Sequence, residues 1–138
     1  MNIYLQIMVV IFSYDIFFYY FHRLLHTKYF YPYHKKHHEY TEPTWRTTYH
    51  ADSIENSISG IGGLIIYILV YPNISIKALL FGNLYCFLNG FVHHEPKFIN
   101  LPIFNWWYND HHVNHHKYFS CNYGREWLDY IHGTKRKV

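Results

Sequence analysis

Histidine is the residue type in this chain that points most clearly to chemistry, because neutral imidazole is the commonest side-chain metal ligand in proteins. The sequence has 13 histidines in 138 residues, more than its 12 lysines and arginines together. His22 and His26 are spaced i, i+4, a spacing that places both rings on one face of a helix. The sequence therefore predicts a metal site that begins at His22.

The pattern His-x-x-His-His occurs twice and is the most specific signal in the chain. The two copies consist of His34, His37 and His38 and of His112, His115 and His116. One copy has a fair chance of arising in a histidine-rich sequence, whereas two copies are hard to obtain without a metal. The adjacent pair His93 and His94 is expected to add a further ligand, and His93 is favoured, with Asn89 one turn before it as a support.

Nine ligands are therefore predicted: His22, His26, His34, His37, His38, His93, His112, His115 and His116. A tetrahedral zinc takes four ligands, so nine imidazoles suit two metal ions with coordination positions left open. Imidazole binds zinc, copper, iron and nickel, so the ligand type alone does not select the metal. No motif for a side-chain nucleophile is present, and no catalytic residue is predicted beyond these ligands.

Other polar residues near the predicted ligands are expected to support them. Asp15 lies on the same helical stripe as His22, where its carboxylate can accept the second ring N–H of that histidine. The residues predicted as additional ligands or supporting partners are Asp15, His50, Asn89, His94, His111 and Asn122.

The elements that must position these residues are apolar. Residues 1–21 are almost entirely apolar, and 21 helical residues span about 30 Å, the thickness of a bilayer core. A signal peptide would need a basic start and a small-residue cleavage site, and neither is present. We expect a transmembrane helix over 1–21, from which the chain emerges at His22.

A second apolar block, over residues 58–92, is interrupted by the turn signal Tyr71-Pro72-Asn73. This pattern predicts a membrane hairpin that returns the chain to the side it left, so that both His-x-x-His-His copies share one face. Of the 12 lysines and arginines, only Lys77 lies away from the histidine side, which the positive-inside rule makes cytosolic.

The sequence thus predicts a single all-α integral membrane domain over residues 1–138. Its parts are one N-terminal transmembrane helix, the central helical hairpin and a cytosolic histidine-rich helical cap (residues 22–57 and 93–138) that forms a two-metal site. The formal charge of +3 is too small to indicate nucleic acid binding. Cys86 and Cys121 form no zinc-finger or disulfide pattern.

A histidine-rich site at a membrane surface, without cysteine ligands, best fits oxygen activation at a non-haem di-iron centre that acts on a lipid. Two alternatives stay open. A membrane zinc hydrolase would need a carboxylate base beside a ligand, as in His-Glu-x-x-His, and that motif is absent. The second alternative is a metal-binding membrane scaffold derived from a di-iron lipid-oxidising enzyme.

The boxes HRLLH, HKKHH and HHVNHH, followed by Phe119 and Asn122-Tyr123-Gly124, closely resemble those of the fatty acid hydroxylase and sterol desaturase superfamily over roughly residues 15–134. The resemblance implies two iron ions, which zinc can replace in a purified protein, with O2 as cosubstrate. It also implies hydroxylation or desaturation of a fatty acyl chain or sterol in the endoplasmic reticulum or its equivalent. Electrons would come from a reductase and a small cytochrome, and the family's histidines carry over onto the nine above.

Two features depart from the family pattern. The closing Trp-Asp-x-x-Phe-Gly-Thr motif is represented by residues 128–134, with tryptophan displaced to Trp127 and His132 in place of phenylalanine. Members usually carry further membrane helices before the first histidine box, whereas one is expected here. A homodimer that completes the membrane region is therefore a further expectation, and this departure favours the scaffold alternative more than the intact boxes do.

Overall fold

The first helix, α1 (Ile3–Leu25), is the element on which the other helices pack. It begins at Asn2, whose side chain accepts a hydrogen bond from the amide of Leu5 and so satisfies one of the free N–H groups of the first turn. The computed structural model describes residues 1–95 and 109–136, and within these ranges α1 is the one helix long and apolar enough to cross a membrane. Phe12 and Ile16, in the middle of this helix, are more than one-third exposed.

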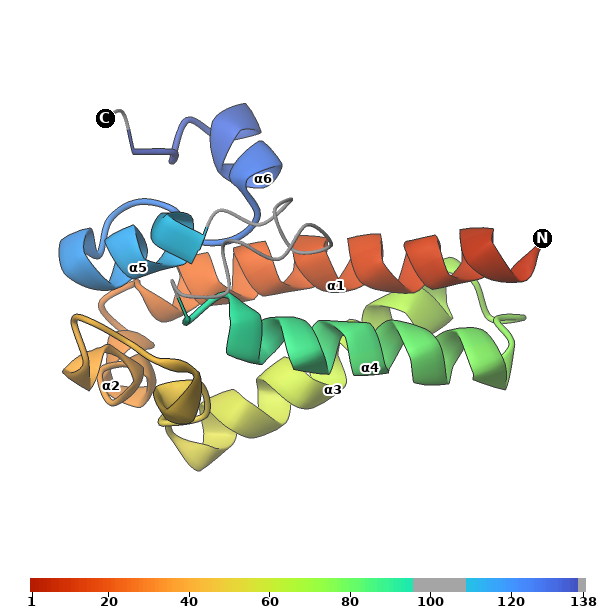
Figure 1. The fold of residues 1–138 in the computed structure, drawn as a ribbon, viewed down its shortest axis with the longest axis horizontal. Coiled ribbons are helices and arrows are strands. Elements are labelled where there is room, and N and C mark those ends of the chain that lie inside the picture. The colour runs from red at the N-terminus through yellow and green to blue at the C-terminus, as the bar shows by residue number, and fades with distance from the viewer. Residues whose placement is uncertain (96–108, 137–138) are drawn as a thin grey trace.

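The hairpin expected over residues 58–92 consists of α3 (Ser53–Val70) and α4 (Ile76–Val92). Asp52 and Ser75 cap these helices through their side chains. Both helices pack on α1, and the Tyr67 hydroxyl accepts a hydrogen bond from Asn83 Nδ2 (2.8 Å) between them. Figure 1 shows α3 and α4 along α1. The helices are thus as expected, and their position in a membrane stays a prediction.

The close approach of α1 and α4 depends on a glycine. A Cβ placed on Gly82 would lie 2.5 Å from Cγ1 and 2.7 Å from Cβ of Val10, a side chain with no exposed surface. We expect Gly82→Ala to destabilise the fold by about 1–3 kcal/mol, because neither helix can move without disturbing the core. Gly60→Ala is the matched control, since nothing lies within 4 Å of its Cβ position and alanine is the better helix former. Thermal unfolding in detergent measures both, and equal midpoints would contradict this packing.

The remaining elements lie around the C-terminal end and the middle of α1, with α6 over the middle (Figure 1). They are α2 (Tyr31–His34), the 3₁₀ helices η1 (His37–Glu39) and η2 (Trp45–Thr47), α5 (Asn109–Tyr118) and α6 (Glu126–Ile131). All regular elements within the described ranges are helical, which confirms the predicted all-α class. The predicted cap includes residues 96–108, which lie outside the described residues.

The two His-x-x-His-His copies lie on different kinds of structure. The first copy is divided, because α2 ends at His34 and a separate 3₁₀ helix begins at His37. The second copy lies wholly on α5.

Candidate metal centre

Nine buried or largely buried histidines converge in two groups, within each of which the candidate ligand nitrogens lie within 4.8 Å of one another. We call them the five-histidine cluster and the four-histidine cluster. The first consists of His22, His26, His34, His38 and His115, and the second of His37, His94, His112 and His116.

Each His-x-x-His-His copy is divided between the two clusters by the same rule. In the first copy, His34 and His38 enter the five-histidine cluster and His37 enters the other. In the second copy the i, i+4 pair enters the four-histidine cluster, and His115 crosses to the first. The motif is therefore suited to bridging two metal positions, because its outer residues serve one and its middle residue serves the other.

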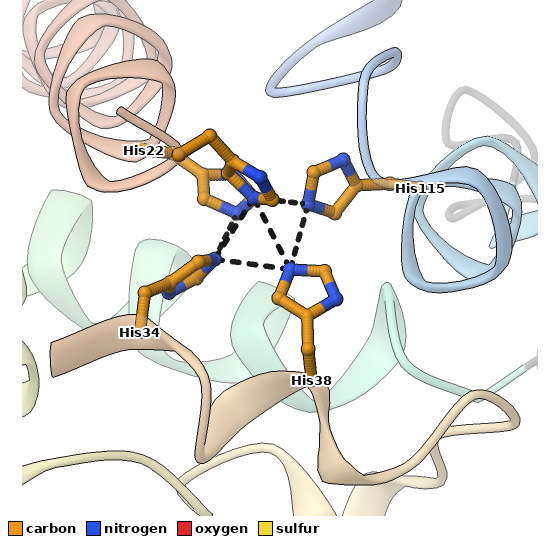
Figure 2. Close-up of side chains that lie close together, drawn as sticks. His22, His34, His38 and His115 are labelled. Carbon is orange, nitrogen blue, oxygen red and sulfur yellow. Dashed lines mark hydrogen bonds between the residues drawn. The ribbon is translucent and has the colours of Figure 1, made fainter. Parts of the chain in front are cut away.

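In the five-histidine cluster the imidazole Nε2 atoms face one another. Figure 2 shows His22, His34, His38 and His115 pointing into a common space. The Nε2 atom of His34 lies 3.1 Å from that of His22 and 3.0 Å from that of His38. His115 Nε2 lies 3.2 Å from His38 Nε2 and 3.0 Å from the Nε2 atom of His26.

The outer ring nitrogens of three of these histidines are held by oxygen atoms. His22 Nδ1 donates to the Tyr123 carbonyl (2.5 Å), and His115 Nδ1 donates to the Cys121 carbonyl (2.6 Å). His34 Nδ1 lies 2.9 Å from Oε1 of the buried Glu55. The two carbonyls place the ring protons of His22 and His115 on Nδ1, so the Nε2 atoms of these two rings carry lone pairs that point into the cluster.

This donor set fits a metal ion. Lone pairs that face one another at about 3 Å repel unless a cation lies between them, and neutral rings protonated at Nδ1 have no Nε2 proton to share. Two imidazole nitrogens bound at right angles to one ion, each about 2.1 Å away, are themselves about 3.0 Å apart. The spacing therefore suits an ion with more than four ligands.

The four-histidine cluster has the same character with different supports. His112 Nε2 lies 3.0 Å from His94 Nε2 and 3.2 Å from His116 Nε2. His94 Nδ1 donates to the carbonyl of Gly90 (3.1 Å), and His116 Nδ1 donates to the carbonyl of Tyr40 (3.0 Å). A second ion with fewer imidazole ligands fits here, with more positions left for other groups.

Burial keeps the imidazoles neutral. Burial, reinforced by the neighbouring imidazoles, lowers the pKa values of His37, His94, His112 and His115 well below the usual histidine value. Burial likewise lowers the pKa of His116 to about 4. At neutral pH these side chains are therefore in the form that binds metals.

The adjacent pair at the end of α4 resolves differently from expectation. His94 lies within the four-histidine cluster, whereas the favoured His93 lies in neither cluster. Both rings are held alike, because His93 Nδ1 contacts the carbonyl of Asn89 (2.9 Å) and His94 Nδ1 that of Gly90 (3.1 Å). We therefore place His94 in the candidate ligand set instead of His93. Asn89 supports His93 as expected, but through its backbone carbonyl and not through its side chain.

The other expected supports lie around the clusters without entering them. Asp15 does not reach His22 and instead pairs with Arg125, with 2.8 Å between Oδ1 and Nε. His50 Nε2 contacts the exposed Glu39 (2.6 Å), and His111 Nε2 contacts Asp129 (3.0 Å). Asn122 lies in the loop after α5, and its side chain donates to the carbonyl of His111.

Sequence reasoning missed most of the groups that hold the histidines. Glu55, which contacts His34, is not among the residues predicted above as ligands or supports. The Tyr123, Cys121 and Tyr40 carbonyls carry no sequence signal at all, since every residue has a backbone carbonyl. Their role follows only from the folded geometry.

A cavity of about 320 Å³ lies between α1, α3 and α4 and reaches both clusters. His22, His37, His93 and His94 contribute to its wall. Its apolar lining includes Phe18, Phe21, Leu25, Phe87 and Ala51. The volume lies within the range of small-molecule pockets. The arrangement can therefore hold an apolar molecule against two metal positions.

Comparison with known proteins agrees with this picture. The profile of the family described as fatty acid hydroxylase matches residues 7–134. The chain is 33% identical over 124 residues to "Fatty acid hydroxylase domain-containing protein 2" of Homo sapiens and, at the same identity, to its counterpart in Macaca fascicularis. These matches cover 87% of this chain and 35% of each relative, so the chain spans about a third of their length. No solved structure matches the chain.

Proposed function

This chain belongs to the fatty acid hydroxylase family, and on that premise we propose that it is an O2-dependent di-iron oxidoreductase that hydroxylates or desaturates a lipid. The substrate is a fatty acyl chain or a sterol, taken at the membrane surface. The observation that carries the proposal is the pair of histidine clusters at the wall of an apolar cavity.

The two clusters would each hold one iron ion, and zinc is the expected substitute in a purified protein. The bound iron pair supplies oxygen activation and the oxidation of an unactivated C–H bond. The chain's own part is to hold the imidazoles in one tautomer through the Nδ1 contacts, and to keep the rings neutral by burial.

The cavity's part is to orient the substrate and to exclude water. His37 and His94 belong to the four-histidine cluster and also line the cavity, whereas His22 is the one residue of the five-histidine cluster in that wall. A C–H bond in the cavity would therefore face mainly the position with fewer imidazole ligands. The aromatic and aliphatic lining favours a hydrocarbon chain over a polar substrate.

The remaining parts of the proposal concern the cellular setting. Family membership and the apolar α1 support a membrane location, and we propose the endoplasmic reticulum or its equivalent with the histidine clusters on the cytosolic side. Electrons would come from a reductase through a small cytochrome. A second copy of the chain is the proposed partner that completes the membrane region.

Metal analysis and lipid profiling together test the proposal. We expect about two irons per purified chain, and a hydroxylated or newly desaturated lipid in cells that express the wild type but not in cells that express His37→Ala. His132→Ala is the matched control, because His132 lies outside both clusters and is exposed. It should retain the product. One zinc per chain after iron-replete expression, or bound iron with no new lipid, would contradict the proposal, and the second result would favour the scaffold alternative.

A further inference from the structure

Asp129, on α6, has no exposed surface, and its carboxylate accepts hydrogen bonds from four donors. Its Oδ1 accepts from the backbone amide of Tyr123 (2.8 Å) and from the hydroxyl of Thr134 (2.7 Å). Its Oδ2 accepts from the amide of Gly124 (3.0 Å) and from His111 Nε2 (3.0 Å). These hydrogen bonds lower the pKa of Asp129 against the opposing effect of burial. The carboxylate is therefore fully engaged in holding other groups.

Two of the four groups that Asp129 binds are backbone amides of residues 121–124, a segment that we call the support loop. Two carbonyl groups of this loop accept the Nδ1 protons of five-histidine cluster members: Cys121 from His115, and Tyr123 from His22. Asp129 fixes the peptide units on either side of the Tyr123 side chain, since it binds the amides of Tyr123 and Gly124. A rotation of either peptide unit would carry the Tyr123 carbonyl away from His22.

The rest of the support loop is held in the same way. Asn122 has a positive φ of 57°, a conformation that asparagine tolerates better than most residues. Its side chain donates to the carbonyl of His111 (2.9 Å) and accepts from the amide of Arg136 (2.8 Å). Its own amide donates to the carbonyl of Thr134 (2.9 Å). The loop is thus fastened at Asn122 to the residues that follow α6, and at Tyr123 and Gly124 to Asp129 on α6.

From these contacts we infer that Asp129 is a positioning residue for the five-histidine cluster, acting through the support loop to orient His22 and His115. The inference rests on the proposed two-metal function. In the four-histidine cluster, by contrast, His94 and His116 are held by the carbonyls of Gly90 and Tyr40, which lie outside this loop. Loss of Asp129 should therefore weaken one metal position much more than the other.

Asp129→Asn is the sharpest variant for testing this inference. Asparagine has the same shape, but its NH2 group must face two donors in either orientation of the amide. Removing such an outer support typically lowers metal affinity by about 10- to 100-fold. Glu126→Gln is the matched control, because it makes the same acid-to-amide change on the same helix. The described ion pair of Glu126 is with the exposed Lys135.

Titration with Zn²⁺, a redox-inert probe, gives the readout. In a His116→Ala background, which leaves the five-histidine cluster intact, Asp129→Asn should lower Zn²⁺ affinity about 10- to 100-fold. In a His115→Ala background, which leaves the four-histidine cluster intact, it should change affinity less than twofold. Glu126→Gln should change neither. Equal losses in both backgrounds, or no loss in either, would overturn the inference.

A second measurement keeps the inference testable where Asp129→Asn fails to fold. Thr134→Val removes one donor to Asp129 Oδ1, and it should weaken the same metal position to a lesser degree. In the metal-free protein, ¹⁵N NMR should show His22 and His115 protonated at Nδ1 in the wild type and a mixture of tautomers in Thr134→Val. Unchanged tautomers together with unchanged Zn²⁺ affinity would contradict the role of Asp129. Because the tautomers are observed without metal, failure of the di-iron proposal remains a separate result.

Discussion

His115→Ala is expected to release one of two bound metal ions and to leave the other in place, and His116→Ala is expected to do the same at the other position. The two residues are neighbours on α5, but His115 faces the five-histidine cluster and His116 faces the four-histidine cluster. Each substitution removes one ligand from one position only. We expect lipid oxidation to fall by more than about 100-fold in both, because a lost ligand costs at least as much as a lost support.

Metal counting after purification measures this prediction. The wild type should contain about two ions, each single variant about one, and the double variant His115→Ala/His116→Ala close to none. Lys117→Ala, the next residue on the same helix, is the control, because its side chain is half-exposed and pairs only loosely with Glu42 (3.4 Å). Loss of both ions from either single variant would show that the clusters do not bind independently.

Asp15→Ala is expected to cost about 3–5 kcal/mol of folding stability, the largest loss that we predict for a residue outside the clusters. Asp15 lies in the middle of the apolar α1 with 7% of its surface exposed, and its carboxylate is 2.8 Å from Arg125 Nε. Alanine would leave the guanidinium in an apolar setting without this carboxylate. The ion pair joins α1 to the residue that precedes α6, so its loss should also loosen the support loop.

A double-mutant cycle separates the pairing from other effects. Asp15→Leu/Arg125→Met replaces both charges by apolar side chains and should be less destabilised than Asp15→Ala alone, as judged by equilibrium unfolding in mild detergent. Glu42→Ala, which breaks the exposed contact with Lys117, should cost less than about 1 kcal/mol. Additive losses from Asp15 and Arg125 substitutions would mean that the buried pair contributes no coupling energy.

The spacing of the histidines carried most of the information about the clusters. Eight of the nine clustered histidines are those that the box patterns singled out. The spacing could not show how each His-x-x-His-His copy divides between two positions. That division depends on the direction of each segment and on the 3₁₀ turn at His37.

The sequence was least informative where distant segments meet. His93 and His94 are adjacent and of the same type, so the sequence could not show that His94, and not His93, lies in a cluster. Asp15 and Arg125 are 110 positions apart, so neither identifies the other as its partner. The helices themselves were easier to predict, because apolar runs bounded by Asp52, Pro72 and Ser75 are local signals.

The distribution of ligands along the chain also sets an order of assembly during synthesis. Four members of the five-histidine cluster lie between residues 22 and 38, whereas His115 comes 77 positions after His38. At roughly 5–20 residues per second, the ribosome needs about 4–15 s to make that interval. Four histidines of the five-histidine cluster are therefore synthesised early, while the four-histidine cluster has only His37 until residue 94 is made. The carbonyl that holds His22 belongs to Tyr123, so the five-histidine cluster reaches its final geometry only after the C-terminal segment has been made.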